Sequence, residues 1–260
     1  MSVEIDSASS LDRAERADLF TSAYEGYLLP FRVDEQQLAG MDAAFDIDVD
    51  ASRIASRDGE LVGLGNLGVR GDDAWIGGVG VVPAARRSGV GEALMHALHE
   101  QAGDRGVHNV WLEVIFENSG AFALYEKLGY RAVRDVEVWS LPAEDGPATA
   151  REVPVDEAHA RLRELRTGRE PWQRADETVA NYNDAHGLET DAGTAVYRQF
   201  GEHVQLLQMA GEPEALLSAL RRLGRVSIVN LPDDDAASPV LGALGGNVVV
   251  RQHEMLLELH

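Results

Sequence analysis

The segment from Val79 to Leu94 constrains the fold of this chain more than any other part of the sequence. It begins with the alternation of a strand, breaks at Pro83, passes glycines at positions 89 and 91, and continues with the spacing of a helix. Glycine has no side chain to block a ligand, so successive backbone amides and the positive helix end can converge on a phosphate. The segment therefore predicts a strand, a short loop and a helix that together bind an anion.

Two arginines add to the anion-binding character of this loop. Arg86 and Arg87 contribute charge and forked donors. The loop is not a Walker A loop, because no Gly-Lys-Ser/Thr follows it, and a diphosphate suits it well. A tight strand-to-helix turn with surface arginines explains the same residues without a ligand, and the pattern alone leaves both interpretations open.

The rest of the first half predicts a mixed sheet. Alternation from Ala51 onward, with turn signals at Asp58-Gly59 and at Gly71–Asp73, predicts an antiparallel meander. Strand, helix, strand, helix and strand then follow, so a parallel element is attached to the meander, and the fold class is α+β with a mixed α/β sheet. The other expected elements are helices at 11–28, starting after Ser9-Ser10, at 34–45, 91–102 and 119–128, a strand at 108–116 and a strand pair around 131–141.

The glycines between Gly63 and Gly68 match the pattern of a dinucleotide-binding fingerprint. That fingerprint needs a following helix and an acid about 20 residues on, whereas here the glycines run into a strand and position 88 is Ser88. We predict that another element packs closely against the backbone at these glycines.

Composition excludes several classes of function. The chain has 260 residues, 44 acidic and 23 basic, and a formal charge of -21, which argues against a nucleic-acid partner. It has no cysteine, so a disulfide, a thiolate metal site and a cysteine nucleophile are impossible. No long apolar stretch is present, which predicts no membrane partner and a cytoplasmic location. The basic residues are arginine except for Lys127, and this acidic, lysine-poor composition resembles that of halophilic proteins.

Later motifs extend the pattern of the glycine loop. Arg86-x-x-Gly89-x-Gly91 is followed by Leu112-Glu113-Val114, by Asn118, and by Leu124-Tyr125-Glu126-Lys127-Leu128-Gly129-Tyr130. These blocks, in this order, resemble the GNAT superfamily of acetyl-CoA-dependent N-acetyltransferases, and the resemblance covers about residues 1–141. It implies the acyl-CoA N-acyltransferase fold, with a sheet that splays between the strands at 75–82 and 108–116 and holds pantetheine in the opening.

The resemblance also implies a role for each matching residue. Asn118 would hydrogen-bond the pantetheine arm, Tyr125 would lie by the sulfur as a proton donor to the leaving thiolate, and Glu113 would be the general base. Acetyl-CoA is the implied co-substrate, and the reaction requires no metal. The remaining implied contacts are backbone pairing of pantetheine with Val79 and Val81, and diphosphate contacts from Arg86, Arg87, Ser88, Gly89, Val90 and Gly91.

Each of these residues also has a structural explanation. Tyr125 could be an ordinary core aromatic, Asn118 a helix N-cap, and Glu113 a carboxylate on a solvated strand face or one bonded to an amide. His96 and His99 lack a further ligand at metal-binding spacing and are explained as surface positions of a helix. Trp75 and Trp111 are predicted to be core residues.

The second half resembles a degenerate copy of the first. Pro142–Ala150 is the expected linker, which divides the chain into domains 1–141 and 151–260. An offset of 116 superimposes the strand, helix and strand that end each half, but it places Val229, Asp234 and Leu241 over the implied functional residues. The domain 151–260 is therefore expected not to bind acetyl-CoA in the same way. Its expected elements are helices at 155–165, 175–185 and 213–223, strands at 195–199, 203–209 and 226–231, a turn-rich patch and a final strand pair.

The leading hypothesis is an N-acetyltransferase that moves an acetyl group from acetyl-CoA to a primary amine by direct attack in a ternary complex. The acceptor would be an amine-bearing small molecule or peptide, and a homodimer is left open. The alternative is a module that senses acyl-CoA or scaffolds a partner without turnover.

Overall fold

The computed structural model describes residues 3–27, 31–146, 150–166 and 168–259. Contacts divide the chain into two compact units. The first comprises Met1–Leu112, Ser119–Arg131 and Met255–His260, and the second comprises Glu113–Asn118 and Ala132–Glu254. Both units are discontinuous in sequence, and the domain boundaries expected at 141 and 151 stay a prediction. Residues 147–149 of the expected linker lie outside the described residues.

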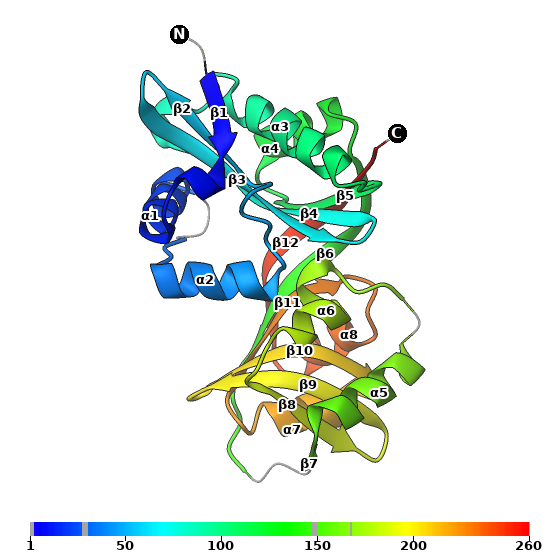
Figure 1. Ribbon diagram of the computed structural model, residues 1–260. Helices are drawn as coiled ribbons and strands as arrows, with labels where there is room; N and C mark the ends of the chain where they lie inside the picture. The colour runs from blue at the N-terminus through cyan, green and yellow to red at the C-terminus, as the bar shows by residue number, and fades with distance from the viewer. Residues whose placement is uncertain (1–2, 28–30, 147–149, 167, 260) are drawn as a thin grey trace. The chain divides into compact units, whose positions relative to one another are not determined.

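The first half of the chain confirms the predicted meander, the strand-helix-strand order and the presence of the predicted helices, and adds an N-terminal strand that was not predicted. The helix expected at 11–28 is shorter and spans Arg13–Ala23. The sequence expected a strand pair around 131–141, but this segment forms one continuous strand. The elements, labelled in Figure 1, are β1 (Val3–Ser7), η1 (Ala8–Ser10), α1 (Arg13–Ala23), α2 (Glu35–Ala44), β2 (Arg53–Arg57), β3 (Glu60–Arg70), β4 (Asp73–Val81), η2 (Pro83–Ala85), α3 (Val90–Asp104), β5 (Asn109–Ile115), α4 (Ser119–Lys127) and β6 (Arg131–Leu141).

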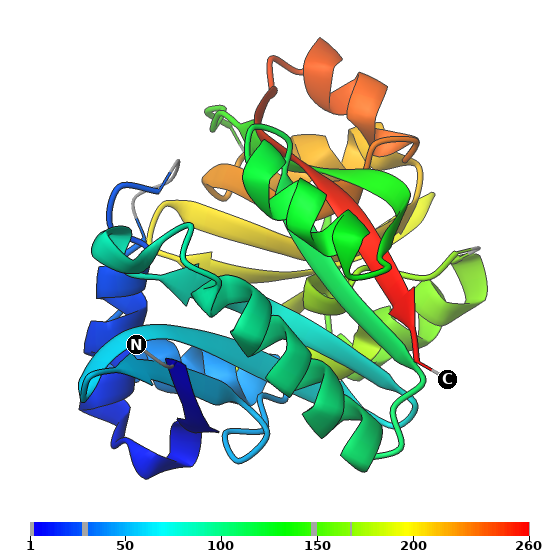
Figure 2. The same cartoon turned by 90° about the horizontal axis from the view of Figure 1, so that it is seen from above.

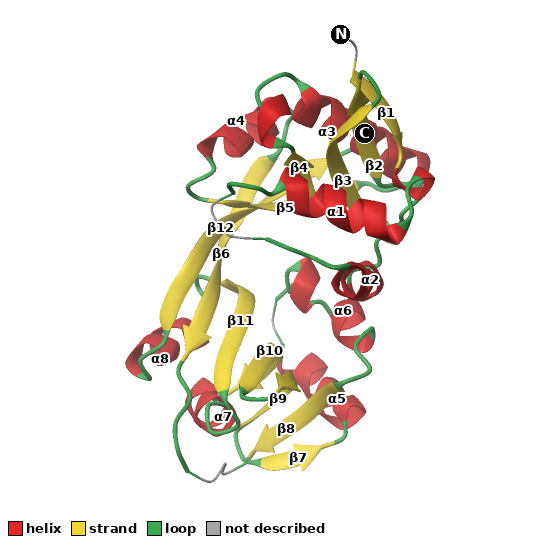
Figure 3. Cartoon of the chain, turned by 90° about the vertical axis from the view of Figure 1, so that its left-hand side faces the viewer, coloured by secondary structure: helices red, strands yellow, loops and turns green. Residues whose placement is uncertain are grey.

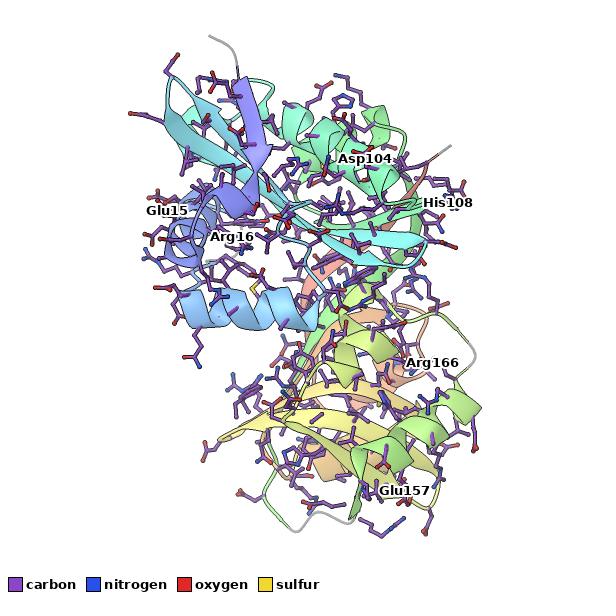
Figure 4. All side chains as sticks on the ribbon, in the orientation of Figure 1. Glu15, Arg16, Asp104, His108, Glu157 and Arg166 are labelled. Atoms are coloured by element: carbon purple, nitrogen blue, oxygen red, sulfur yellow. The ribbon has the colours of Figure 1, made fainter. Side chains whose placement is uncertain are left out.

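Capping boxes set where the first two helices begin. In α1 the Asp12 side chain accepts from the backbone amide of Glu15, and the Glu15 side chain accepts from the backbone amide of Asp12. Ser9 and Ser10 lie in the 3-10 turn that precedes α1. α2 begins with an equivalent box. Arg16, labelled in Figure 4, then joins the two helices through two bonds of 3.0 and 3.1 Å to Asp42.

The sheet of the first unit has helices on both faces. Its strand order is β1-β2-β3-β4-β5, antiparallel up to β4 and parallel between β4 and β5. Phe20 and Ala23 of α1 pack with Leu64 on one face, and Val90 and Leu94 of α3 pack on the other. Figure 2 shows α3 lying over these strands.

Glycines in β3 allow α3 to approach closely. A Cβ at Gly63 would lie 3.1 Å from a methyl of Leu94, and one at Gly65 would lie 2.6 Å from a methyl of Leu98. The prediction that an element packs against these glycines is confirmed, and they lie in a strand rather than in a dinucleotide-binding turn.

The second half contains more short elements than the sequence indicated. The helix expected at 175–185 ends at Ala180, a strand not predicted follows it, and the turn-rich patch contains a helix. The elements are β7 (Arg151–Val153), α5 (Val155–Leu165), η3 (Trp172–Arg174), α6 (Asp176–Ala180), β8 (Ala185–Thr190), β9 (Gly193–Phe200), β10 (His203–Gly211), α7 (Pro213–Leu220), β11 (Arg225–Pro232), α8 (Ala237–Ala243) and β12 (Asn247–Glu258).

The strand pairs predicted at 131–141 and at the end of the chain are each a single strand, β6 and β12. Polar residues in the middle of each segment resemble a turn in sequence. In the fold they pair between the two strands, with Arg134 2.6 Å from Glu254 and Asp135 2.7 Å from His253. The charges are therefore compatible with unbroken strands.

In the second unit the strand order is β12-β6-β11-β10-β9-β8-β7. α5 packs on one face of this sheet with Val196 and Leu207, and α7 and α8 pack on the other with Leu206 and Ile228 (Figure 3). The offset of 116 superimposes β5 on β11, α4 on α8 and β6 on β12. The predicted correspondence between the ends of the two halves is thus confirmed at the level of secondary structure.

Candidate functional site

The strands β4 and β5 are paired over only part of their length. Their parallel register ends at Trp75 and Trp111. Just beyond it, the register of β4 with β3 shifts, so that Gly77 and Gly78 together lie opposite Asn66. Gly78 has a φ of +126°, and a bulge of this kind bends a strand away from its neighbour. β4 is therefore open along the edge beyond Trp75.

Backbone groups of Val79 and Val81 point toward this open edge. The amide of Val82 donates to the Val62 carbonyl at 2.9 Å, and alternation along an antiparallel ladder then turns the amides of Val79 and Val81 away from β3. The Val81 carbonyl accepts from Nε of Arg86 at 3.0 Å. The two amides are placed to pair with an extended ligand, which is the geometry that the family resemblance implies for pantetheine.

The loop from Arg86 to Gly91 leads into α3 and has left-handed backbone at two residues. Arg87 and Gly89 have φ values of 58° and 85°, and Gly89 has no atom within 4 Å of the position that a Cβ would take. The Ala93 amide donates to the Gly89 carbonyl at 3.0 Å. Within the described residues, it is the first amide at this end of α3 that donates to a backbone carbonyl. The preceding amides lie at the positive end of α3, where an anion is stabilised.

The side chains of the loop have other partners. Arg86 donates to the carbonyls of Ala23 at 3.2 Å and of Glu25, at the end of α1. Ser88 accepts from Arg57 at 2.8 Å. Arg87 is exposed. The Arg86 guanidinium therefore holds the end of α1 against the loop.

Tyr125 is buried, and the half-buried phenols of Tyr24 and Tyr27 influence its titration or are influenced by it. The Tyr125 side chain is 9% exposed, and burial, followed by the effect of Tyr27, raises the pKa of its hydroxyl. Burial, with smaller effects of Tyr125 and Tyr27, also raises the pKa of Tyr24. The Tyr24 hydroxyl lies 2.5 Å from where a Cβ at Gly78 would be, so this glycine makes room for it. At neutral pH these phenols are protonated and can donate.

His99 does not occupy the surface position predicted for it. Its Nε2 lies 2.8 Å from the Tyr130 hydroxyl, and the Tyr130 ring contacts that of Tyr125 at a centroid distance of 5.8 Å. Burial, with a smaller effect of His96, lowers the pKa of His99 to about 4. His96 is exposed, as predicted. Residue spacing on α3 could not distinguish the two, because their difference depends on where Tyr130 packs.

Glu113 and Asn118 belong to the second unit. Glu113 is half-buried on β5, and its Oε2 accepts from Nε2 of Gln173 at 2.9 Å. The Asn118 amide donates to the Ile115 carbonyl at 2.8 Å, just before α4. Sequence reasoning did not find Gln173, since nothing in the local pattern around η3 indicates a partner 60 residues away.

Of the two tryptophans predicted to be core residues, Trp75 is buried at 6% exposure. Trp111 is half-buried, and its Nε1 donates to Asp73 at 2.9 Å.

In the described residues, no group of three or more His, Cys, Asp or Glu side chains could hold a metal ion. Within the same residues, no helix is long and apolar enough to span a membrane.

The pattern of the Acetyltransferase (GNAT) family matches residues 17–130. The chain contains a GNAT domain. The matched region holds the open edge of β4, the glycine loop and Tyr125.

Sequence relatives match part of the chain. The [Ribosomal protein bS18]-alanine N-acetyltransferase of Escherichia coli K12 is 42% identical over 59 residues, which are 23% of this chain and 40% of that protein. The mycothiol acetyltransferase of Paenarthrobacter aurescens is 42% identical over 71 residues, 27% of this chain and 20% of that protein. The chain thus spans less than half the length of the curated relatives that it matches.

Solved structures extend the similarity in fold to the whole chain. A putative acetyltransferase from Pyrococcus horikoshii has a TM-score of 0.72 at 19% identity and covers 99% of this chain and 90% of its own. A GCN5-related N-acetyltransferase from Sphaerobacter thermophilus has a TM-score of 0.75 at 20% identity, with 98% and 95% covered. A tandem GNAT protein from the clavulanic acid biosynthesis pathway has a TM-score of 0.68 at 16% identity, with 99% and 98% covered. This GNAT domain therefore occurs in a tandem GNAT fold, as predicted.

Proposed function

We propose that the protein is an N-acetyltransferase that moves an acetyl group from acetyl-CoA to a primary amine by direct attack in a ternary complex. The observation that carries this proposal is the run of backbone amides from Arg87 to Gly91, which precede the first amide that donates within α3 and lie next to the open edge of β4. The amides suit a diphosphate, and the edge at Val79 and Val81 suits an extended pantetheine arm. Asn118 is assigned to the same arm through the family resemblance.

The reaction exchanges one bond for another. The amine nitrogen forms a bond to the thioester carbonyl carbon, and the bond from that carbon to sulfur breaks, so that the electron pair leaves with the sulfur. Tyr125 donates a proton to the leaving thiolate, and Glu113 takes a proton from the attacking amine. The raised pKa of Tyr125 keeps its proton in place at neutral pH.

The acceptor is proposed as an amine-bearing small molecule or peptide. Relatives named as alanine N-acetyltransferases of ribosomal protein bS18 match part of the chain. A peptide that begins with alanine is therefore the first acceptor to try. A cytoplasmic location, the continuous domains 1–141 and 151–260, and a homodimer stay predictions.

Two measurements on the full chain test the proposal. Calorimetry should detect binding of acetyl-CoA, and a thiol-release assay should detect turnover with an alanine-initiated peptide, a polyamine or a lysine-containing peptide. Binding of acetyl-CoA without thiol release on any of these amines would favour the non-catalytic sensor or scaffold. Absence of binding would contradict both functions.

A further inference from the structure

Gln173 connects the second half of the chain to the carboxylate proposed as the base. The carboxylate of Glu113 can only accept hydrogen bonds when it is ionised, so the Gln173 atom at 2.9 Å is its amide nitrogen, which donates. Both residues belong to the second unit. Gln173 lies in η3, within the part of the chain that has no glycine loop of its own.

The segment around Gln173 is held by its two neighbours in sequence. Trp172 is buried, and its carbonyl accepts from the Thr178 hydroxyl at 2.6 Å. Arg174 is 2% exposed; its Nε donates to Glu170 at 2.8 Å, and its carbonyl accepts from Gln208. Since the residues on both sides are fixed, the Gln173 amide is presented in a defined position.

Ion pairs anchor the flanks of this segment. Arg169 lies 2.6 Å from the buried carboxylate of Glu254, which Arg134 also contacts at 2.6 Å. Arg166, labelled in Figure 4, lies 2.8 Å from Asp176 at the start of α6. The Glu254 carboxylate is 1% exposed, so removing either of its arginines would leave a buried charge less well compensated.

Charged side chains on the η3 segment and on β12 have ion-pair partners of their own. On the η3 segment, Arg174 is paired with Glu170. On β12, where the Arg251 carbonyl accepts from the Phe116 amide at 3.0 Å, Arg251 is paired with Glu137 and His253 with Asp135. The Gln173 amide is a neutral donor to Glu113.

We propose that Gln173 is a positioning residue that orients the Glu113 carboxylate and stabilises its ionised form through its amide. The inference rests on the proposed role of Glu113 as the base that takes a proton from the amine. The half of the chain without its own glycine loop then contributes directly to the reaction, through one hydrogen bond.

The first experiment measures the pKa of Glu113 by carboxyl 13C NMR of the full chain, with Glu113→Gln used to assign the signal. In Gln173→Leu, a similar volume without a donor, we expect this pKa to rise by about one unit, because a hydrogen bond to the charged form favours that form. In Gln173→Glu the second carboxylate should raise it further. Gln205→Leu on β10 is the matched control and should leave the pKa of Glu113 unchanged. An unaltered pKa in Gln173→Leu, in a chain that unfolds as cooperatively as the wild type, would overturn the proposal.

The second experiment separates this inference from the role of Glu113. The acid limb of the kcat/KM profile for thiol release should move to higher pH in Gln173→Leu, and the shift should vanish in a Glu113→Gln background. If Glu113→Gln keeps full activity and the same profile, the base assignment fails, although the NMR result still decides whether Gln173 holds the carboxylate. If Glu113→Gln removes the acid limb but Gln173→Leu leaves it in place, the base stands and the positioning role is refuted.

Discussion

At the scale of single residues, the proposed chemistry depends on one oxygen atom of Tyr125. The phenol is buried and its pKa is raised by that burial, with a smaller effect of Tyr27. Tyr125→Phe keeps the ring and its contact with Tyr130 but removes the proton donor. We expect kcat for thiol release to fall by about 10²-fold, with little change in acetyl-CoA affinity by calorimetry. Tyr182→Phe, in the second unit, is the control and should keep the wild-type rate. An unchanged kcat in Tyr125→Phe would return this residue to a purely structural role.

His99 gives a second prediction at this scale, in stability rather than in rate. Its pKa is lowered to about 4 by burial, with a smaller effect of His96, while an unfolded histidine has a pKa of about 6.5. Between these values the unfolded chain binds more protons, so the stability that comes from neutral His99 is complete above about pH 6.5 and is lost as the pH falls toward 4.

His99→Gln can still bond the Tyr130 hydroxyl but does not titrate. We therefore expect the variant to lose less free energy of unfolding than the wild type between pH 7 and pH 5. Urea unfolding at both values measures the difference. Equal losses in the two proteins would show that His99 is not held neutral by the fold.

At the scale of elements, the start of α3 depends on a left-handed residue. Gly89 has a φ of +85°, which a side chain adopts only at a cost of about 1 kcal/mol or more. Gly89→Ala should shift the amides that follow it and weaken acetyl-CoA binding by roughly tenfold in calorimetry. Gly106, after the other end of α3, also has a positive φ, of 73°, and equally open space. Gly106→Ala should lose similar stability yet keep its affinity. Equal affinities in the two variants would refute the diphosphate assignment.

At the scale of the whole molecule, the charge of -21 sets the dependence on salt. Repulsion among acidic side chains destabilises a compact chain, and raising the ionic strength from 0.1 to 1 M shortens the Debye length from about 10 to about 3 Å. We expect the Tm to rise by roughly 5 °C between these KCl concentrations. Differential scanning calorimetry measures this change in Tm. A Tm that stays constant or falls as KCl is raised would contradict the prediction.

Much of the fold was predictable because its signals are local. Strand alternation, the turns at Asp58-Gly59 and Gly71–Asp73, and the glycine loop act within a few residues, and the structure has the meander and the strand-loop-helix where they were expected. The structure also has β6 and β12 at corresponding places in the two halves, as expected. The two predicted strand pairs were wrong because polar residues in β6 and β12 resembled turns, and their charges are compensated only after the strands come together.

The sequence by itself determined that the chain has a glycine loop at the start of a helix, a parallel strand pair after a meander, and a repeated ending. These are properties of backbone conformation, which glycine, proline and apolar spacing control directly. Only the tertiary structure decided that the Arg86 guanidinium binds the main chain of α1, that His99 bonds Tyr130, and that Gln173 reaches Glu113. Each of these contacts joins segments at least 31 residues apart, so which side chains meet depends on how whole elements pack and not on the pattern around either residue.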